Sequence, residues 1–390
     1  MNIAFISYWG LNEGLTQATV LPHLEILKKL SSDINVTLFT FERNNDNLKI
    51  DSEFQFKIIQ VSVSGLKSHF QVWRKFKKIH LQKKFDYIIC RSSLAGIIGF
   101  WAKKKLNIPF CVESFEPHTD YMIEAGEWKK NSVKARILRY YEKKQKLYAD
   151  YILPVAQNYK ERLLQEGIPA KKILVMPCAV DIEKFKFNSQ ERTIIRDKLG
   201  INPSAVCGIY IGKFGGIYYD QKAFEIFKHC QSIFESFFLL LLSPESRHQI
   251  EKKMTAIGFT TDMYYHSCVP FQEVPKYLSA ADFAFSLHSS SPSKKYLSPI
   301  KNGEYWANGL PIVMSENIGD DVDIIDNNQI GVIFNSEQFE ENLSKLPAML
   351  KDPVGKSRKI TIPDFAKRYR SFDIVHDQYT IIIDNIIGNT

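Results

Sequence analysis

The chain has 390 residues, 45% of them hydrophobic and 24% charged, which is the composition of a globular protein and excludes a disordered chain. Because this length exceeds what one ordinary hydrophobic core supports, we expect two domains. The formal net charge of +8 is uneven, since residues 1–186 hold 30 Lys+Arg against 19 Asp+Glu and the remainder holds 21 against 24.

Targeting and redox signals are sparse. The longest apolar run, FFLLLL, is far shorter than the roughly 20 residues of a membrane-spanning helix. The segment MNIAFISYWG has no basic residues ahead of its apolar ones, so we expect no signal peptide. The six cysteines show no CxxC spacing, a pattern typical of buried thiols in a reducing compartment. We therefore expect a cytoplasmic protein.

The first half of the chain alternates strand and helix patterns. Short apolar runs predict buried strands at NIAFIS, NVTLFTF, FKIIQV, DYIIC, PFCVES, YILPV and ILVMP. Apolar residues at helical spacing lie between them in LTQATVLPHLEILKKLS, VWRKFKKIHLQKK, AGIIGFWAKKK and NSVKARILRYYEKKQKLY. This alternation is typical of a parallel sheet covered by helices.

The pattern restarts after PCAVDIEKFKFN. A second set of strands is predicted at VCGIYIG, FFLLLLS, MYYHSCV, DFAFSL, LPIVM and IGVIF. We predict an α/β protein with two Rossmann-like doubly wound parallel-sheet domains, 1–186 and 187–364, facing across a cleft. Segment 365–390 contains a final amphipathic helix.

Ligands of open parallel sheets bind at the carboxyl ends of strands, so the loops there are the first place to look for a site. Glu304 lies near the start of a predicted helix, where a carboxylate is stabilised by the helix dipole whatever its function. Ser298 and Ile300 follow the serine-rich loop after DFAFSL, and their backbone N–H groups together with Lys301 suit a diphosphate. A carboxylate one turn further can accept hydrogen bonds from a ribose diol. The stretch therefore indicates a nucleotide-sugar site.

The second half resembles the nucleotide-binding domain of the family 4 retaining glycosyltransferases of the GT-B fold. That family carries a Glu-x7-Glu element followed by a small residue, Gly and Pro-Val, and Glu304, Ala307, Gly309, Pro311 and Ile312 match its second half. VMPCAVDIEKF and SAADFAFSL are similar to two further elements of the family, so that the resemblance covers roughly residues 170–335. It implies the GT-B fold and a terminal helix that crosses back to the first domain.

Some positions depart from the family pattern. Tyr296 stands where the family has its first glutamate, close to the transferred sugar, which leaves the sugar contacts and turnover open. In YIGKFGG, Gly212 and Lys213 stand where the family has a Gly-Arg pair that neutralises the diphosphate, although an ordinary glycine turn with a solvated lysine would look the same. The family's second lysine is displaced. Backbone groups near Val269 are expected to recognise the base.

Two loops of the first half are candidates for the acceptor side. Gly10 and Gly14 in SYWGLNEGLTQ let the backbone approach a ligand closely, although an ordinary strand–helix loop would look similar. VESFEPHTDYM brings Glu113, Glu116 and His118 directly after a predicted strand. The resemblance implies a cleft histidine here, so we assign His118 a positioning and electrostatic role near the reacting sugar.

The resemblance implies a retaining transfer that needs no cofactor and no metal. The donor is a nucleotide-sugar, and catalysis depends on charge stabilisation of the departing diphosphate. We expect His118, Lys213 and Glu304 to be the catalytic residues, with Lys301 on the diphosphate. Neither a GxGxxG nor a GxxxxGK[ST] loop is present, which argues against a dehydrogenase and a P-loop NTPase.

The basic half points to the acceptor. Its two basic helical segments have apolar residues at Val72, Phe76 and Ile79, and at Val133 and Ile137 with Tyr141. They are either ordinary surface helices, apolar inside and charged outside, or helices that dock on anionic lipid at the inner face of the cell membrane. No nucleic-acid motif is found, so we expect no nucleic-acid partner.

The expected activity is transfer to a glycan or lipid-linked acceptor in cell-surface polysaccharide or glycolipid synthesis. Two alternatives stay open at this level. A nucleotide-sugar epimerase of the GT-B fold would bind the same donor without an acceptor, and a non-catalytic relative would bind nucleotide or glycan without turnover.

Overall fold

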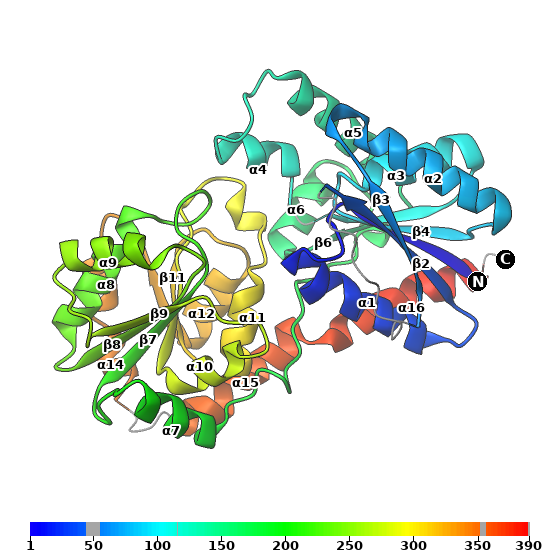
Figure 1. Cartoon of the computed structure of the whole chain (residues 1–390). Coiled ribbons are helices and arrows are strands. Elements are labelled where there is room, and N and C mark those ends of the chain that lie inside the picture. The colour runs from blue at the N-terminus through cyan, green and yellow to red at the C-terminus, as the bar shows by residue number, and fades with distance from the viewer. Residues whose placement is uncertain (44–54, 115, 352–355, 389–390) are drawn as a thin grey trace. The chain divides into compact units, whose positions relative to one another are not determined.

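The computed structural model describes residues 1–43, 55–114, 116–351 and 356–388 (Figure 1). The chain forms two compact units, one of which joins Met1–Ala179 to Phe372–Thr390 while the other is Val180–Ser371. Each unit contains one six-stranded sheet with parallel strand pairs. The expected α/β architecture with two parallel-sheet domains is confirmed.

The chain passes from the first unit to the second after Ala179 and returns to the first unit after Ser371. The sequence-based division after residues 186 and 364 stays a prediction of domain organisation. In the structure, helix α15 (Lys356–Arg370) lies in the second unit and helix α16 (Phe372–Gly388) in the first.

The first sheet has the strand order β3-β2-β1-β4-β5-β6. Its strands are β1 Asn2–Ser7, β2 Asn35–Glu42, β3 Lys57–Ser62, β4 Tyr87–Arg91, β5 Phe110–Ser114 and β6 Tyr151–Pro154. The helices of this unit are α1 Leu21–Leu30, α2 Ser68–Gln82, α3 Gly96–Leu106, α4 His118–Glu124, α5 Val133–Tyr148, α6 Gln157–Gln165 and α16.

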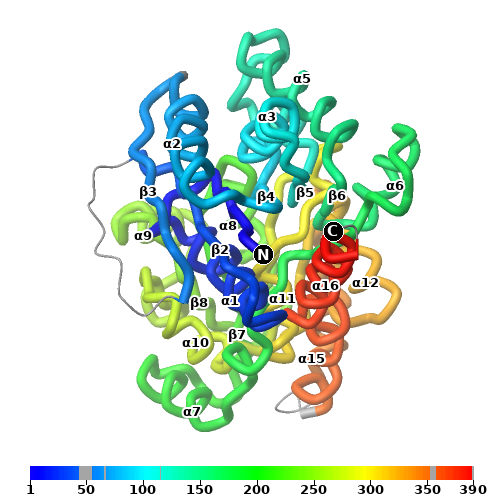
Figure 2. The backbone as a smooth tube through the Cα atoms, turned by 90° about the vertical axis from the view of Figure 1, so that its right-hand side faces the viewer, coloured from blue at the N-terminus to red at the C-terminus, as the bar shows by residue number. Residues whose placement is uncertain are grey.

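Helices cover both faces of the first sheet, which is why its strands are apolar runs (Figure 2). Leu38 packs in the core that contains α1 and α16. The next residue of the strand, Phe39, meets Phe76 of α2 with ring centroids 5.7 Å apart. Because neighbouring strand residues point to opposite faces, α2 lies on the face opposite α1 and α16.

The second sheet has the order β12-β11-β10-β7-β8-β9. Its strands are β7 Val206–Ile211, β8 Phe237–Leu242, β9 Tyr264–Ser267, β10 Phe283–Ser286, β11 Ile312–Ser315 and β12 Gly331–Phe334. Its helices are α7 Ser189–Lys198, α8 Gln221–Ile233, α9 Arg247–Ala256, α10 Val274–Ala280, α11 Ile300–Ala307, α12 Asp321–Asn328, α13 Phe339–Leu343, α14 Leu346–Met349 and α15. Ile209 of β7 packs with α7, α10, α11 and α15, and Tyr210 packs with α8 and α9 on the other face.

Some local predictions differ from the structure. ILVMP, expected as a strand, is not a regular strand, although Ile173 bridges Ile152 and the N–H groups of Leu174 and Met176 donate to carbonyls of β6. The helix expected near Leu15 begins as a π-helix, Thr16–Val20, that continues into α1. Five of the six cysteines are buried as expected, whereas Cys268 is exposed.

A buried ion pair fastens α15 to the sheet-covering helices of its unit. Arg370, 3% exposed, donates through Nη2 to Oδ1 of Asp321, which is 1% exposed. Asn302 of α11 donates to the other oxygen of Asp321 at 2.7 Å. The guanidinium also lies 5.9 Å from the ring of Trp306. One carboxylate therefore holds the ends of three helices together.

Replacing Asp321 by Asn should lower the free energy of unfolding by about 3–5 kcal/mol, because it leaves the Arg370 guanidinium buried without its counter-charge. Urea unfolding followed by circular dichroism measures this. Asp323→Asn is the matched control, since Asp323 is exposed in the same helical turn and should change stability by less than about 0.5 kcal/mol. Equal effects of the two substitutions would contradict the role of the buried pair.

Candidate functional site

The second sheet reverses the direction of its connections between β7 and β10, which are neighbours although β8 and β9 lie between them in the chain. In open parallel sheets a ligand binds outside the carboxyl ends of the strands at this point. A pocket of about 230 Å³ opens there, lined by Tyr210, Ile211, Tyr218, Phe285, Ser286, Leu287, His288, Pro299, Ile300 and Lys301. The loop after β7, the loop after β10 and the start of α11 thus meet in one cavity.

These two loops are tied to each other by backbone and side-chain contacts. Tyr218 and His288 form an antiparallel bridge, and the N–H of Tyr219 donates to the carbonyl of Leu287 at 3.1 Å. The buried ammonium of Lys294 donates to the carbonyl of Ile217 at 3.1 Å. The walls of the pocket are therefore held in place without a ligand.

Lys301, the second residue of α11, brings a positive charge to the pocket. Its Nζ lies 5.1 Å from the ring centroid of Tyr218 and forms no ion pair with any carboxylate that the structure describes. It also lies against the backbone of Gly212, where an added Cβ would approach Nζ to 2.5 Å. Gly212 has φ +137°, a conformation that favours glycine. The backbone conformation therefore favours glycine at the end of β7, and a Cβ there would also force the flexible end of the Lys301 side chain to move.

Glu304 lies one helical turn after Lys301. The side chain is buried, with 5% exposure of the residue, and its carboxylate accepts no hydrogen bond from any residue in the described part of the chain. Burial raises the pKa of Glu304 to about 7, although the charges of Lys301 and Lys184 oppose this. A carboxylate without donors is free to accept them from a ligand.

His288 is a further polar group of this pocket, which the sequence-based reasoning missed. Its pKa is lowered to about 3, mainly by burial and then by the charges of Lys301 and Lys294, so the imidazole is neutral at physiological pH. Its ring centroid lies 4.8 Å from that of Tyr218. The signal was present in the sequence, because His288 follows directly after the strand DFAFSL.

Most of the other residues predicted for the donor side lie outside this pocket. Of the predicted donor residues, Ile300 and Lys301 line the pocket, whereas Lys213, Val269, Tyr296, Ser298 and Glu304 do not. Lys213 is exposed, and its carbonyl accepts a hydrogen bond from Tyr210 at 2.7 Å. Tyr296 and Ser298 are buried, and Val269 is half-buried just after β9. Lys184, also missed from the sequence, adds charge near Glu304.

In the first unit, the glycine loop after β1 is filled by carboxylates. The N–H of Gly10 donates to Glu13 at 2.9 Å, and the N–H of Leu11 donates to Glu42 at 3.0 Å. An added Cβ on Gly10 would lie 2.6 Å from a carboxylate oxygen of Glu42, whereas Gly14 is exposed with nothing nearby. Gly10 therefore permits a close approach, but to a side chain of the protein itself.

Glu113 lies in the core and not at the surface. It is 1% exposed and accepts hydrogen bonds from Arg91 of β4 and from the hydroxyl of Tyr379 in α16, whose oxygen also lies 2.9 Å from Nδ1 of His23. Burial by itself would raise the pKa of Glu113, but Arg91, followed by His23 and Tyr379, lowers it to about 2. This carboxylate fastens α16 to the first sheet.

His118 and Glu116 form a pair near the start of α4. Their Nδ1 and Oε1 atoms are 2.6 Å apart, and the imidazole is 17% exposed. Burial alone would lower the pKa of His118, but the hydrogen bond and charge of Glu116 outweigh it, so the pKa lies above its usual value. The ring stacks on Tyr121 and meets Trp128 edge-on. The structure thus offers an oriented imidazole that carries positive charge more readily than a free one.

Two absences concern only the residues that the structure describes. No group of three or more His, Cys, Asp or Glu side chains gathers there in a way that could hold a metal ion. None of the helices there combines the length and the apolar character needed to cross a bilayer.

The comparison with protein families gives one match. Residues 24–184 match the model described as Glycosyltransferase Family 4, so the family resemblance stated from the sequence is confirmed. The match lies in the first unit, whereas the motifs that carried the resemblance lie mostly in the second. No curated protein sequence matches the chain significantly.

Solved structures resemble the whole chain. Sucrose-phosphate synthase from Thermosynechococcus elongatus has 15% identity, full coverage of both chains and a TM-score of 0.77. HepE from Anabaena in complex with UDP-glucose has 13% identity, 99% and 100% coverage and a TM-score of 0.74. WaaG, a glycosyltransferase involved in lipopolysaccharide biosynthesis, has 16% identity, 97% and 99% coverage and a TM-score of 0.68. A putative UDP-N-acetylglucosamine 2-epimerase from Listeria monocytogenes is similar at 13% identity, 100% and 97% coverage and 0.63. At these identities the likeness establishes the fold, and the GT-B architecture expected from the sequence is confirmed.

The raised pKa of Glu304 predicts that this carboxylate destabilises the protein without ligand. Since the pKa is about 7 in the folded chain and lower when unfolded, the cost is absent below the unfolded pKa and complete above about pH 7. Glu304→Gln should therefore increase the free energy of unfolding at about pH 8 by on the order of 3 kcal/mol and change it little at about pH 4.5.

Urea unfolding at the two pH values tests this prediction. Glu337→Gln serves as control because Glu337 is an exposed acid of the same unit, and its effect should be small at both pH values. If the Glu304→Gln variant is no more stable than wild type at the higher pH, the ionised carboxylate does not lower the free energy of unfolding.

Proposed function

From the match of residues 24–184 to glycosyltransferase family 4, we propose that the chain is a retaining glycosyltransferase that needs no metal. It transfers a sugar from a nucleotide-sugar to a glycan or lipid-linked acceptor in cell-surface polysaccharide or glycolipid synthesis. The similar structures support the class of donor, because HepE was solved with UDP and with UDP-glucose.

The observation that carries this proposal is the pairing of an unneutralised ammonium with an unsatisfied carboxylate at one end of α11. The Lys301 ammonium and the positive end of the α11 dipole suit the diphosphate, which supplies a counter-charge to Lys301. One turn further, Glu304 suits the ribose hydroxyls, whose O–H groups supply its missing donors. One ligand would supply both the counter-charge and the hydrogen-bond donors.

The chemistry follows from this placement. As the bond between sugar and diphosphate breaks, negative charge grows on the leaving group, and Lys301 with the helix amides stabilises it. Lys213, exposed beside Gly212, is assigned to the same diphosphate. His118, polarised by Glu116, is assigned to positioning and electrostatics on the acceptor side, with Gly10 and Gly14 in the loop that follows β1 of the same sheet. Glu113 contributes by holding α16 and the sheet in place.

The first alternative is a nucleotide-sugar epimerase, and the similarity to the putative epimerase from Listeria is the reason to test it. It would bind the same donor, and product analysis with an acceptor omitted separates the two activities. A non-catalytic relative is the second alternative, and it would bind the donor without turnover. The separate exposed helix face described below favours the transferase, because an epimerase has no acceptor to approach.

The donor site predicts selective stabilisation by one nucleoside diphosphate. A ligand at 100 times its dissociation constant raises the free energy of unfolding by about 2.7 kcal/mol, which is measurable as a shift in Tm. UDP, GDP, ADP, CMP and their sugars are compared. Gly212→Ala should reduce the shift, because its Cβ would push the Lys301 ammonium out of its present position.

Gly200→Ala controls for backbone strain in this experiment, because Gly200 also has positive φ but has no atom within 4 Å of an added Cβ. It should lose stability yet keep the nucleotide shift. Absence of a shift with every nucleotide would refute the nucleotide-sugar site, and a normal shift in Gly212→Ala would refute the place given to Lys301.

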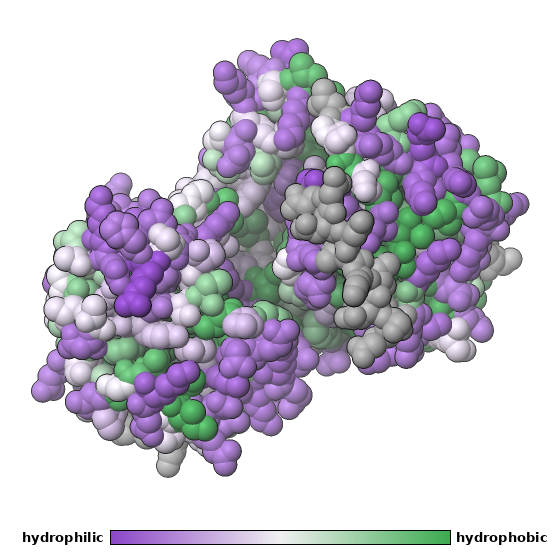
Figure 3. Space-filling view, in the orientation of Figure 1, coloured by the Kyte–Doolittle hydropathy of each residue, from purple (hydrophilic) through white to green (hydrophobic). Residues whose placement is uncertain are grey.

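The acceptor side of the proposal rests on α5. Val133, Ile137, Tyr140 and Leu147 are 71%, 50%, 53% and 56% exposed and recur at helical spacing, while Ala135, Leu138 and Gln145 face inward. Of the two alternatives left open for this segment, an ordinary surface helix with its apolar residues inside does not fit Val133 and Ile137, because Ala135 and Leu138 face the core of the unit instead. On the face shown in Figure 3, apolar side chains lie among hydrophilic ones over the first unit. In α2 the corresponding residues Val72, Phe76 and Ile79 are buried, as in an ordinary surface helix.

Basic residues flank the exposed stripe of α5, namely Lys134, Arg136, Arg139, Lys143, Lys144 and Lys146. An apolar stripe between cations matches an anionic lipid surface, on which the protein would act as a peripheral enzyme at the cytoplasmic face.

Vesicle sedimentation tests the α5 stripe. The protein should sediment with phosphatidylglycerol vesicles more than with phosphatidylcholine vesicles, and Val133→Ser with Ile137→Ser should reduce the bound fraction several-fold. Ile194→Ser, which removes an exposed apolar side chain of the second unit, should leave binding unchanged. Equal binding of both variants would show that α5 is not the contact.

A further inference from the structure

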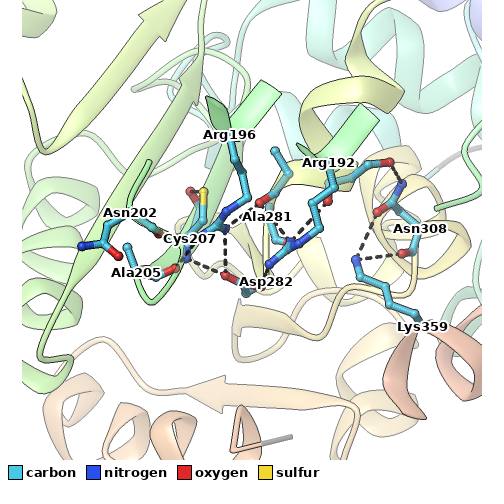
Figure 4. A network of polar contacts seen from close by, with 12 residues as sticks. Arg192, Arg196, Asn202, Ala205, Cys207, Ala281, Asp282, Asn308 and Lys359 are labelled. Carbon is cyan, nitrogen blue, oxygen red and sulfur yellow. Dashed lines mark hydrogen bonds and ion pairs between the residues drawn. The ribbon is translucent and has the colours of Figure 1, made fainter. Parts of the chain in front are cut away.

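A larger pocket lies at the opposite edge of the second sheet from the candidate donor site. Its volume is about 870 Å³, and Arg192 and Arg196 of α7 are among its lining residues. Both arginines form ion pairs with Asp282, which directly precedes β10 (Figure 4). Asp282 also accepts from the N–H of Cys207 in β7 at 2.8 Å. The pocket therefore sits at the amino ends of β7 and β10, whereas the candidate donor pocket sits at their carboxyl ends.

The floor of this pocket carries more positive than negative charge. Arg192 donates to Oδ1 of Asp282 at 2.7 Å, and Arg196 lies 3.5 Å from Oδ2 of the same carboxylate. The remaining contacts of the two guanidinium groups are to backbone carbonyls, among them those of Ala280 and Ala205. Two fixed cations thus share one anion, and Arg196 is only 7% exposed.

Lys359 of α15 adds a third cation without a counter-charge. Its ammonium donates to the carbonyl and side-chain oxygens of Asn308 at 3.0 and 3.2 Å, both of them neutral acceptors. Within residues 1–43, 55–114, 116–351 and 356–388, no carboxylate forms an ion pair with it. Burial lowers the pKa of Lys359 to about 7, Asp282 opposes this shift, and Arg192 and Arg358 add to it.

The walls of the pocket are partly apolar. Their apolar part is formed by Ile182, Phe187, Ile201, Pro203, Ile360 and Pro363. Polar side chains complete the lining, namely Glu183, Lys186, Ser189, Thr193, Asp197 and Lys367, so that its lysines and arginines outnumber its carboxylates. Ile360 is 73% exposed, so part of the apolar lining is open to solvent. The volume falls in the range of pockets that bury small organic ligands.

We propose that this pocket binds an amphipathic anion, a phosphate or carboxylate group attached to an apolar body. The anionic group would lie between Lys359 and the two arginines, and the apolar body along the walls. The pocket is separate from the donor site but shares α11 with it, since Asn308 caps the end of the helix whose first turns carry Lys301 and Glu304. This inference does not depend on the proposed glycosyl transfer.

The probe for this site is octyl sulfate below its micelle concentration, because its charge does not change with pH over the range used. Isothermal titration calorimetry on the full chain should show saturable binding, with weaker binding of inorganic phosphate and none of uncharged octyl glucoside. Affinity should fall between about pH 6 and about pH 9, because Lys359 loses its proton and its charge as the pH rises through its pKa.

Variants assign the effect to Lys359. Lys359→Gln should weaken octyl sulfate binding at about pH 6 by about tenfold or more, the value of a charge-assisted hydrogen bond. Lys359→Arg should retain binding at about pH 9, since arginine stays charged. Lys345→Gln, which removes an exposed lysine of the same unit outside the pocket, is the control and should bind as wild type does.

Each contrary result overturns the proposal. Unchanged affinity in Lys359→Gln would remove the lysine from the site, and equal binding of octyl glucoside would show that charge is not recognised. Inorganic phosphate that binds as tightly as octyl sulfate would refute the apolar part of the ligand. Thermal melting of each variant without ligand separates loss of binding from loss of fold.

Discussion

The parallel pairing of β7 with β10 is the constraint on which the second unit depends. It aligns Gly208 with Phe283 and brings together two loops that are distant in the chain. Because both strands run in the same direction, their carboxyl ends open on one edge and their amino ends on the other. Ile211 and His288 line one pocket at the first edge, and the N–H of Cys207 donates to Asp282 at the second. Both pockets of this unit are consequences of that single pairing.

Charge is distributed around these pockets in a way that folding alone would not favour. Glu304 is buried without donors, Lys301 has no described counter-charge, and Lys359 donates only to neutral oxygens. Such groups lower stability unless a ligand compensates them, which is the usual relation between a binding site and the fold that holds it. By contrast, Asp321 and Arg370 are buried but neutralise each other, as a structural pair does.

The first unit shows how a group that follows a strand can have a purely internal role. Glu113, Glu116 and His118 are close in sequence, yet Glu113 turns into the core while His118 stays partly accessible. The difference comes from partners elsewhere in the chain. Arg91 in the neighbouring strand and Tyr379 in α16 supply Glu113 with a charge and a donor, so burial of its carboxylate is compensated.

The sequence by itself determined the alternation of strands and helices, the two sheets and the start of α11 with Lys301 and Glu304. These features depend on local periodicity and on which loop follows which strand, and both can be recognised along the chain. Only the tertiary structure decided that Tyr379 reaches Glu113, that Val133 and Ile137 face outward, and that Lys359 meets Asn308 beside a cavity. Those outcomes depend on contacts between residues far apart in the chain, and no local spacing specifies which distant side chains will share a buried space.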